Sequence, residues 1–189
     1  MQVEKQIKVW DPLVRSFHWV LAGSFLVAYA SGEDFLTLHS WAGYIIGVAL
    51  LIRIVWGFVG TPYARFKDFV TSPGKALQYA KDTLSMRAKR YIGHNPAGGL
   101  MIITMIVSLL ITTFTGIALF GAAEQAGPMA SLFAASGSIW EDPLEEIHEF
   151  FANFALLLVA IHVAGVIVES LIHRENLVGS MISGFKRTN

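Results

Sequence analysis

The chain has 189 residues, 14 of them Lys or Arg and 14 Asp or Glu. It is 54% hydrophobic and only 15% charged, with a mean hydropathy of +0.54, which excludes a soluble globular domain and indicates a membrane protein. We expect no nucleic-acid partner. Cysteine is absent, which rules out disulfides, cysteine-ligated iron–sulfur clusters and thioether-attached haem.

Four long stretches are poor in charge, and each is near the ~20 residues that a helix needs to cross the ~30 Å hydrocarbon core. We predict transmembrane helices over residues 15–32, 36–58, 96–121 and 146–172. Few residues remain for a separate soluble domain. The sequence therefore predicts an all-α integral membrane protein, in which residues 1–189 form a single four-helix bundle.

Charges between the spans indicate their orientation. All 14 Lys and Arg lie in residues 1–15, 57–95 and 173–189 or at Arg53. The connections on the other side have eight acidic residues and no basic one: Glu33, Asp34, Glu124, Glu141, Asp142, Glu145, Glu146 and Glu149. By the positive-inside rule, we predict a multi-pass protein of the bacterial inner membrane, surrounded by lipid, with both termini in the cytoplasm.

The first two spans each place a histidine near one membrane edge. In "VWDPLVRSFHWVL", Arg15 lies at the inner edge and His18 near the inner end of the span. In "HSWAGYIIG", His39 lies near the outer end of the second span. Gly43 and Gly47 follow one and two turns further along the same helix face.

Short signals mark the elements that follow. The stretch "TSPGKALQYAKDTLSM" predicts a short amphipathic helix on the cytoplasmic surface, with Ser72 as cap and Pro73 at the first position. It serves either as a tether or as a docking surface for a partner. In "GHNPAGG", Asn95 caps the third span and Pro96 begins it. We expect the apolar outer loop "QAGPMASLFAASGSIW" to fold back against the helix ends or to meet a partner.

The fourth span contains "HEFFANFALLLVAIH", which begins with His148 and ends with His162. Fourteen residues rotate the helix to within about 40° of four full turns, so both imidazoles project from one face. They are about 21 Å apart along the axis. One metal ion cannot be bound by both, whereas two separate ligand sites can.

Depth in the membrane selects a partner for each of these histidines. His39 can face His148 in the outer half, and His18 can face His162 in the inner half. Two histidine pairs across a four-helix bundle are the axial ligands expected for two b-type haems, which need no cysteine. The alternative is four ordinary polar residues with hydrogen-bond partners, but buried intramembrane imidazoles are costly and these form two depth-matched pairs.

Residues around the pairs fit a bound porphyrin. Gly43 and Gly47 give flat room for the macrocycle, although the same small-residue pattern is typical of helix packing. Arg15 and Arg53 lie at the inner edge, where they pair with haem propionates or, alternatively, contact solvent or lipid phosphate.

Two further histidines, His94 and His173, lie at the cytoplasmic ends of the third and fourth spans. We expect them to be too superficial to join either pair. They are interfacial polar residues, and contact with a propionate or a quinone head group stays open for both.

Four stretches together, "VWDPLVRSFHWVL", "LHSWAGY", "GHNPAGG" and "HEFFANFALLLVAIH", resemble the prokaryotic cytochrome b-561 family. The chain is also similar to the membrane cytochrome b subunits of nickel–iron hydrogenases and of formate dehydrogenase. The resemblance covers nearly the whole chain. It implies haem ligands at His18, His39, His148 and His162, the same four that depth and spacing select.

Two imidazoles fill both axial positions of each iron, so the iron is suited to exchanging electrons and has no open site. The resemblance implies that one terminus of this path is the quinone pool. We predict electron transfer through two haem b groups between membrane quinone and a redox partner at the outer, periplasmic face. That partner is a dehydrogenase, a hydrogenase or a cytochrome c.

There are three alternatives to this electron-transfer function. Superoxide oxidation with quinone reduction needs no protein partner, but the acidic outer face repels an anion. A non-redox transporter or metal channel would favour carboxylates at depth, and the spans lack them apart from Glu169 near the inner end. A simple membrane anchor leaves the histidine pairing unexplained.

Overall fold

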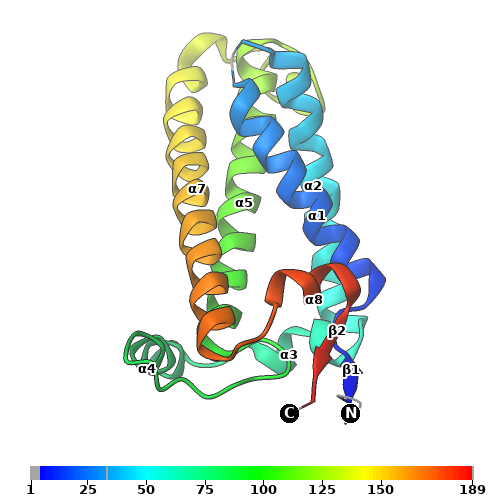
Figure 1. The fold of residues 1–189 in the computed structure, drawn as a ribbon. Helices are drawn as coiled ribbons and strands as arrows, with labels where there is room; N and C mark the ends of the chain where they lie inside the picture. The colour runs from blue at the N-terminus through cyan, green and yellow to red at the C-terminus, as the bar shows by residue number, and fades with distance from the viewer. Residues whose placement is uncertain (1–4, 33, 189) are drawn as a thin grey trace. The chain divides into compact units, whose positions relative to one another are not determined.

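The structure is a computed structural model that describes residues 5–32 and 34–188 (Figure 1). Its elements are β1 (Gln6–Lys8), α1 (Pro12–Ser31), α2 (Leu36–Val59), η1 (Pro62–Ala64), α3 (Phe66–Phe69), α4 (Pro73–Leu84), α5 (Pro96–Ala123), α6 (Ala130–Phe133), η2 (Gly137–Trp140), α7 (Glu141–Ile172), α8 (Leu177–Ser183) and β2 (Phe185–Arg187). By length and apolar composition, α1, α2, α5 and α7 can each cross a membrane. The four predicted helices are therefore confirmed.

The predicted bounds miss polar residues at the helix starts. Helix α7 begins at Glu141 rather than at residue 146, because Glu141 and Asp142 in its first turn interact favourably with the positive end of the helix dipole. Helix α1 begins at Pro12, directly after Asp11, whose Oδ1 accepts a hydrogen bond from Val14 N at 2.9 Å. A prediction based on hydropathy alone starts too late at such polar turns.

The chain forms two compact units. Unit 1 comprises Met1–His18, Ile52–Thr104 and Leu158–Asn189, and unit 2 comprises Trp19–Leu51 and Met105–Leu157. Each long helix contributes residues to both units. The prediction of one bundle domain over residues 1–189 stays a prediction.

Unit 1 has its core where the start of α1 meets the end of α2. Val9, Trp10, Val14 and Ala64 form the buried cluster, with Trp56 among the side chains packed against it. Asp11 links the segment before α1 to the end of α2 and the residues after it. Its Oδ2 accepts hydrogen bonds from Trp56 Nε1 at 3.0 Å and from Thr61 Oγ1 at 2.6 Å.

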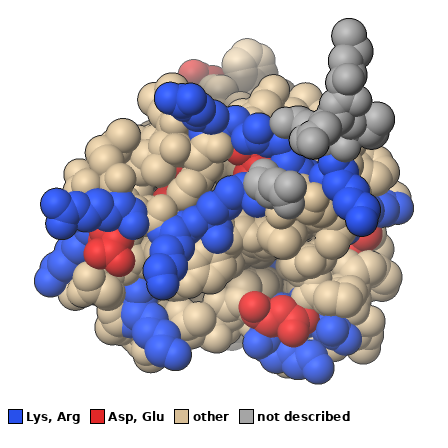
Figure 2. Space-filling view, turned by 60° about the horizontal axis from the view of Figure 1, so that its bottom comes forward, with Lys and Arg blue, Asp and Glu red and all other residues tan. Residues whose placement is uncertain are grey.

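A small sheet in unit 1 was not predicted by the all-α assignment. Strand β1 pairs antiparallel with β2, with Ile7 opposite Lys186. Each strand has three residues, too few to show an alternating pattern, and the pairing joins the two ends of the chain. Figure 2 looks onto the face that carries these strands and α4, and it shows Lys and Arg side chains gathered there with few acidic ones between them.

The predicted short helix after Ser72 and the predicted Asn95 cap are found, while the cytoplasmic position of the short helix stays a prediction. Helix α4 begins at Pro73 with Ser72 as its N-cap residue, although the Ser72 side chain makes no cap hydrogen bond. At α5, Asn95 Oδ1 accepts a hydrogen bond from Gly98 N at 2.6 Å, which confirms the predicted cap.

The outer loop lies in unit 2 and folds back, as one of its two predicted alternatives has it. A Cβ on Gly121 would lie 2.9 Å from the carbonyl carbon of Met129, so this loop packs directly on the end of α5. A Cβ added to Gly127, which has a φ of +78°, would likewise lie 2.9 Å from the Tyr44 hydroxyl of α2. Leu132 and Ile139 of the same loop remain exposed.

Candidate metal centres formed by paired histidines

His39 and His148 face each other in unit 2. The first lies in the first turns of α2 and the second in the N-terminal part of α7. Their ring centres are 5.9 Å apart and their planes make an angle of 72°. The structure thus brings together the two residues that depth in the membrane matched.

Both rings of this outer pair are held by backbone carbonyls. His39 Nδ1 donates to Ala28 O at 2.9 Å, and His148 Nδ1 donates to Thr112 O at 2.8 Å. A carbonyl oxygen only accepts, so each Nδ1 carries the proton and each Nε2 keeps its lone pair. This arrangement fixes the tautomer and the ring orientation of metal-bound histidines.

A glycine makes room for the His148 ring. A Cβ on Gly116 would lie 2.7 Å from His148 Cε1 and 3.0 Å from Nδ1, so the ring lies directly on the backbone of α5. Thr115 Oγ1 lies 3.4 Å from the same Nδ1. Sequence reasoning missed Ala28, Thr112 and Gly116, and the only available signal was an isolated glycine inside an apolar helix.

The two glycines of the predicted haem pocket differ in their surroundings. Nothing lies within 4 Å of a Cβ built on Gly43, so there is open space one turn from His39. At Gly47 the added Cβ would lie 3.2 Å from Thr113 Cγ2 of α5, which is the contact of helix packing.

His18 and His162 face each other in unit 1. Their ring centres are 6.4 Å apart, with planes at 53°. We call these residues the inner pair, and His39 with His148 the outer pair, after the predicted orientation. Each unit therefore contains one complete pair.

The spacing of both pairs fits one metal ion between two imidazoles. A metal–imidazole bond is about 2 Å long. Ring bonds of about 1.3 Å put the ring centre about 1.1 Å behind the nitrogen, so two trans imidazoles have centres about 6 Å apart. Among the described residues, no group of three or more His, Cys, Asp or Glu could hold a metal ion. Two histidines alone suit a cofactor whose macrocycle supplies the other ligands, as a haem does.

Arg53 is a buried cation that forms no ion pair with any described residue, although Asp11 acts on it over a longer distance. The residue is only 3% exposed, and its guanidinium carbon lies 4.9 Å from the centre of the Phe66 ring. Its Nη1 is buried and makes no hydrogen bond to any described residue. Since an isolated buried charge is costly, the site fits an anionic group of a bound cofactor.

Arg15 is more strongly tied to the protein. It donates to the Ile182 carbonyl oxygen, while its Nε is buried without a hydrogen-bond partner among the described residues. Of the two predicted propionate partners, Arg15 is thus partly satisfied by the protein, and Arg53 is the stronger candidate to bind an anion.

His94 and His173 join neither pair, as predicted, but His94 is not superficial. Its ring lies 4.6 Å from those of Trp10 and Phe69, and its Nδ1 is buried without a hydrogen-bond partner among the described residues. Burial, with the nearby positive charge of Arg53, lowers the pKa of His94 to about 3. The prediction was wrong because Trp10, just before α1, and Phe69 of α3 pack against the His94 ring.

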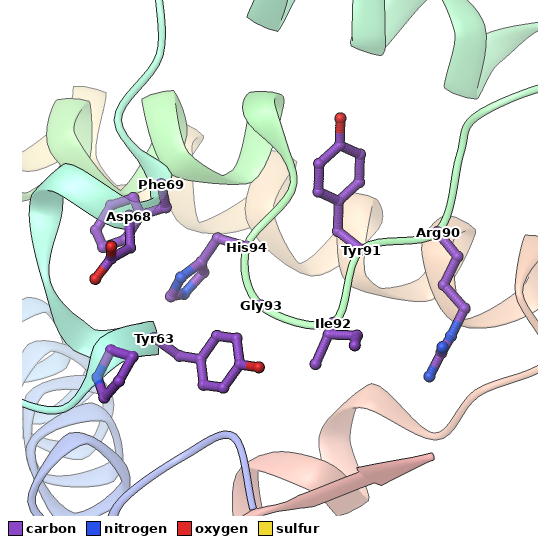
Figure 3. Close-up of a pocket in the computed structure, with 9 residues that line it drawn as sticks. Tyr63, Asp68, Phe69, Arg90, Tyr91, Ile92, Gly93 and His94 are labelled. Atoms are coloured by element: carbon purple, nitrogen blue, oxygen red, sulfur yellow. The ribbon is translucent and has the colours of Figure 1, made fainter. Parts of the chain in front are cut away.

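A cavity of about 470 Å³ opens beside His94 in unit 1. Figure 3 shows the ring of His94 turned toward Tyr63, with Ile92 and Tyr91 on the loop that leads into α5. The other lining residues are Pro62, Asp68, Phe69, Arg90 and Gly93.

The matches to known proteins cover the part of the chain that contains all four paired histidines. The model of the family described as prokaryotic cytochrome b561 matches residues 9–184. A probable Ni/Fe-hydrogenase B-type cytochrome subunit of Rhizobium leguminosarum bv. viciae is 28% identical, over 96% of this chain and 90% of the relative. Proteins of the same description from Azotobacter vinelandii and Cupriavidus necator are 28% and 26% identical, over 98% and 96% of this chain and 91% and 87% of theirs. No solved structure matches the chain.

The family match agrees with the fold and with the composition. The matched residues 9–184 include both histidine pairs and all four helices that are able to cross a membrane. The chain belongs to the prokaryotic cytochrome b561 family and is a multi-pass membrane cytochrome of the b type, a carrier in electron transport.

Proposed function

We propose that this cytochrome carries electrons across the membrane through two b-type haems, one held by His39 and His148 and the other by His18 and His162. The observation that carries the proposal is the spacing of the two pairs, 5.9 and 6.4 Å between ring centres. Both distances are close to the ~6 Å of two imidazoles on one iron.

The bound haem supplies a one-electron couple, and the chain determines how that couple is used. With one histidine of a pair on each side, the iron of a bound haem would have no open position for oxygen or another ligand. The carbonyls of Ala28 and Thr112 hold the outer pair in position, so little reorganisation accompanies electron transfer. A carbonyl acceptor on Nδ1–H also makes the ligand nitrogen more electron-donating.

Arg53 is the proposed partner of a propionate of the inner haem. Its buried Nη1 without a hydrogen bond and its position in the same unit as His18 and His162 support this role. Arg15 is the second proposed contact, through its buried Nε. Gly43 supplies open space for the outer macrocycle, while Gly47 lines the same helix face and packs on α5.

The proposed electron path connects the quinone pool of the bacterial inner membrane with a redox partner at the periplasmic face, with both termini in the cytoplasm. The names of the relatives favour a nickel–iron hydrogenase as that partner. The exposed apolar side chains of Leu132, Ile139 and Trp140, among acidic neighbours, support docking of a protein at this face.

The test is the haem content of detergent-purified protein, measured by visible spectra of the oxidised and dithionite-reduced states and by a pyridine haemochrome assay. We expect two low-spin b haems per chain. His148→Ala and His162→Ala should each remove one haem, and a different one in each case. His173→Ala, in the turn just after the same helix and in neither pair, is the control and should keep both.

Other outcomes separate the alternatives. A colourless protein would overturn the proposal and favour a transporter or an anchor. Two haems without reaction with a hydrogenase, but with superoxide-dependent quinone reduction, would keep the haem assignment and change the partner.

A further inference from the structure

Glu169 is a carboxylate near the inner end of α7, two turns beyond His162. Seven residues rotate the helix to within about 20° of two full turns, so Glu169 and His162 project from the same face of α7. The rise between them is about 10 Å. Glu169 is only 9% exposed, although it lies close to the basic end of the span.

The contacts of Glu169 are with hydroxyls and an imidazole. Its Oε2 accepts from the Tyr79 hydroxyl at 3.0 Å, and its Oε1 accepts from Thr83 Oγ1 at 3.1 Å. His173 Nε2 lies 3.2 Å from Oε2. No described Lys or Arg nitrogen lies within ion-pair distance of this carboxylate.

The hydrogen-bonded cluster of Glu169, Tyr79 and Thr83 has more acceptor contacts than protons, so it can accept one further proton. The Tyr79 hydroxyl also lies 2.9 Å from Lys89 O, and Thr83 Oγ1 also lies 3.0 Å from Tyr79 O. Two hydroxyl protons thus serve four acceptor contacts. A proton added to Glu169 would convert a carboxylate that only accepts into a group that can also donate, without any movement of heavy atoms.

Glu175, six residues further along the chain, provides the contrast. It is similarly buried, at 7% exposure, but it lies 2.8 Å from Arg90 Nη2 and 3.4 Å from Lys186 Nζ. Although burial acts to raise the pKa of Glu175, these two cations outweigh it and lower that pKa. Glu175 is thus paired with two cations, whereas Glu169 contacts two hydroxyls and an imidazole.

We propose that Glu169, with Tyr79 and His173, forms a proton-loading site that takes up one proton when the inner haem is reduced. The inference rests on the proposed function, because it requires an iron between His18 and His162. With haem bound, reduction of the inner iron by one electron from the outer haem would be accompanied by transfer of one proton from water at the inner face to the Glu169 carboxylate, which would become a carboxylic acid. The added negative charge and the added proton compensate each other across about two helical turns.

The groups around Glu169 identify it as the proton acceptor. Tyr79 and Thr83 face it from α4 and His173 faces it from the turn just after α7, while Tyr91 contacts Tyr79 with ring centres 5.5 Å apart. Lys186 of β2 acts on Glu169 only over a longer distance, and it forms its ion pair with Glu175. Burial together with the Glu169 carboxylate raises the pKa of Tyr79, so Tyr79 keeps its own proton and serves as a donor.

The test is a redox titration of both haems in the full-length protein between pH 5.5 and 8.5, with His148→Ala used to identify the wave of the inner haem. We expect the inner potential to fall as pH rises, by at most about 59 mV per tenfold change in proton concentration for one proton per electron. Glu169→Gln should flatten this slope. Glu175→Gln, the matched control, should keep it.

Two further measurements keep the inference falsifiable if Glu169→Gln binds haem poorly. Tyr79→Phe removes one donor and should move the pH range of the slope without abolishing it. The reduced-minus-oxidised infrared difference spectrum of the unaltered protein should contain a carbonyl band of a protonated carboxyl group, shifted in Tyr79→Phe.

The results distinguish the inference from the function on which it rests. An inner haem with the same slope in Glu169→Gln as in the unaltered protein, or with no carboxyl band, overturns the proton-loading site and leaves the electron carrier standing. A chain that binds no haem at the inner pair overturns the proposed function itself.

Discussion

The rings of His39 and His148 lie with centres 5.9 Å apart, each with its Nδ1 proton donated to the carbonyl of another helix. Side chains that are already fixed in this way need no rearrangement to receive a flat cofactor between them. Gly116, which has no side chain, allows the His148 ring to lie directly against α5.

Gly116→Ala should remove the outer haem and leave the inner one. Its Cβ would lie 2.7 Å from His148 Cε1, so the ring must move away from the carbonyl that orients it. Haem content by pyridine haemochrome should fall from about two haems per chain to about one. Gly23→Ala, where nothing lies within 4 Å of the added Cβ, is the control. Unchanged haem in Gly116→Ala would contradict the ligand role of His148.

Arg53→Met should lower the potential of the inner haem. Loss of a positive charge near the propionates disfavours the reduced, more negative state. Coulomb's law over ~10 Å at an effective dielectric constant of ~20 gives about 1.7 kcal/mol, equivalent to tens of millivolts. Spectroelectrochemical titration measures the shift, and the outer haem in the same molecule is the internal control. Arg53→Lys should restore most of the potential, and equal shifts at both haems would count against the assignment.

Asp11→Ala should destabilise unit 1. It removes the cap of α1 and the acceptor of Trp56 and Thr61, and the expected cost is about 1–3 kcal/mol. Thermal unfolding in detergent, followed by circular dichroism, measures this loss. Asp68→Ala, which breaks a more exposed ion pair with Arg65, should cost about 1 kcal/mol or less.

Asp11 also makes the stability of the protein depend on pH. Burial of Asp11 acts to raise its pKa, but hydrogen bonds from Thr61, Trp56 and backbone amides outweigh burial and leave this pKa lowered. A carboxyl group whose pKa is lower in the folded state contributes stability above its unfolded pKa and loses it as pH falls through the folded value. The unaltered protein should therefore lose more stability than Asp11→Ala on acidification below about pH 4. Parallel curves for the two proteins would rule out this contribution.

The absence of cysteine makes the predicted orientation directly testable. Single cysteines at exposed positions, Lys89→Cys in the inner loop and Leu132→Cys in the outer loop, leave one labelling site each. In intact spheroplasts, a membrane-impermeant maleimide should label residue 132 and not residue 89. Inverted vesicles should show the opposite result, and labelling of residue 89 in spheroplasts would reverse the orientation.

The four helices and the two histidine pairs could be predicted because both follow from one-dimensional patterns. Apolar length specifies the spans, and spacing along α7 puts His148 and His162 on one face. The acceptors of the outer pair could not be predicted, because Ala28 and Thr112 act through backbone carbonyls that every residue has. The burial of His94 depends on a loop distant in sequence, which no local pattern encodes.

The pairing of β1 with β2 has a consequence for the order of assembly. β2 spans Phe185–Arg187, so β1 keeps an unpaired edge until these residues have been synthesised. Unit 2 uses residues only up to Leu157 and can assemble around the outer pair before β2 has been made. Unit 1 needs both strands, so the inner pair closes after the outer pair.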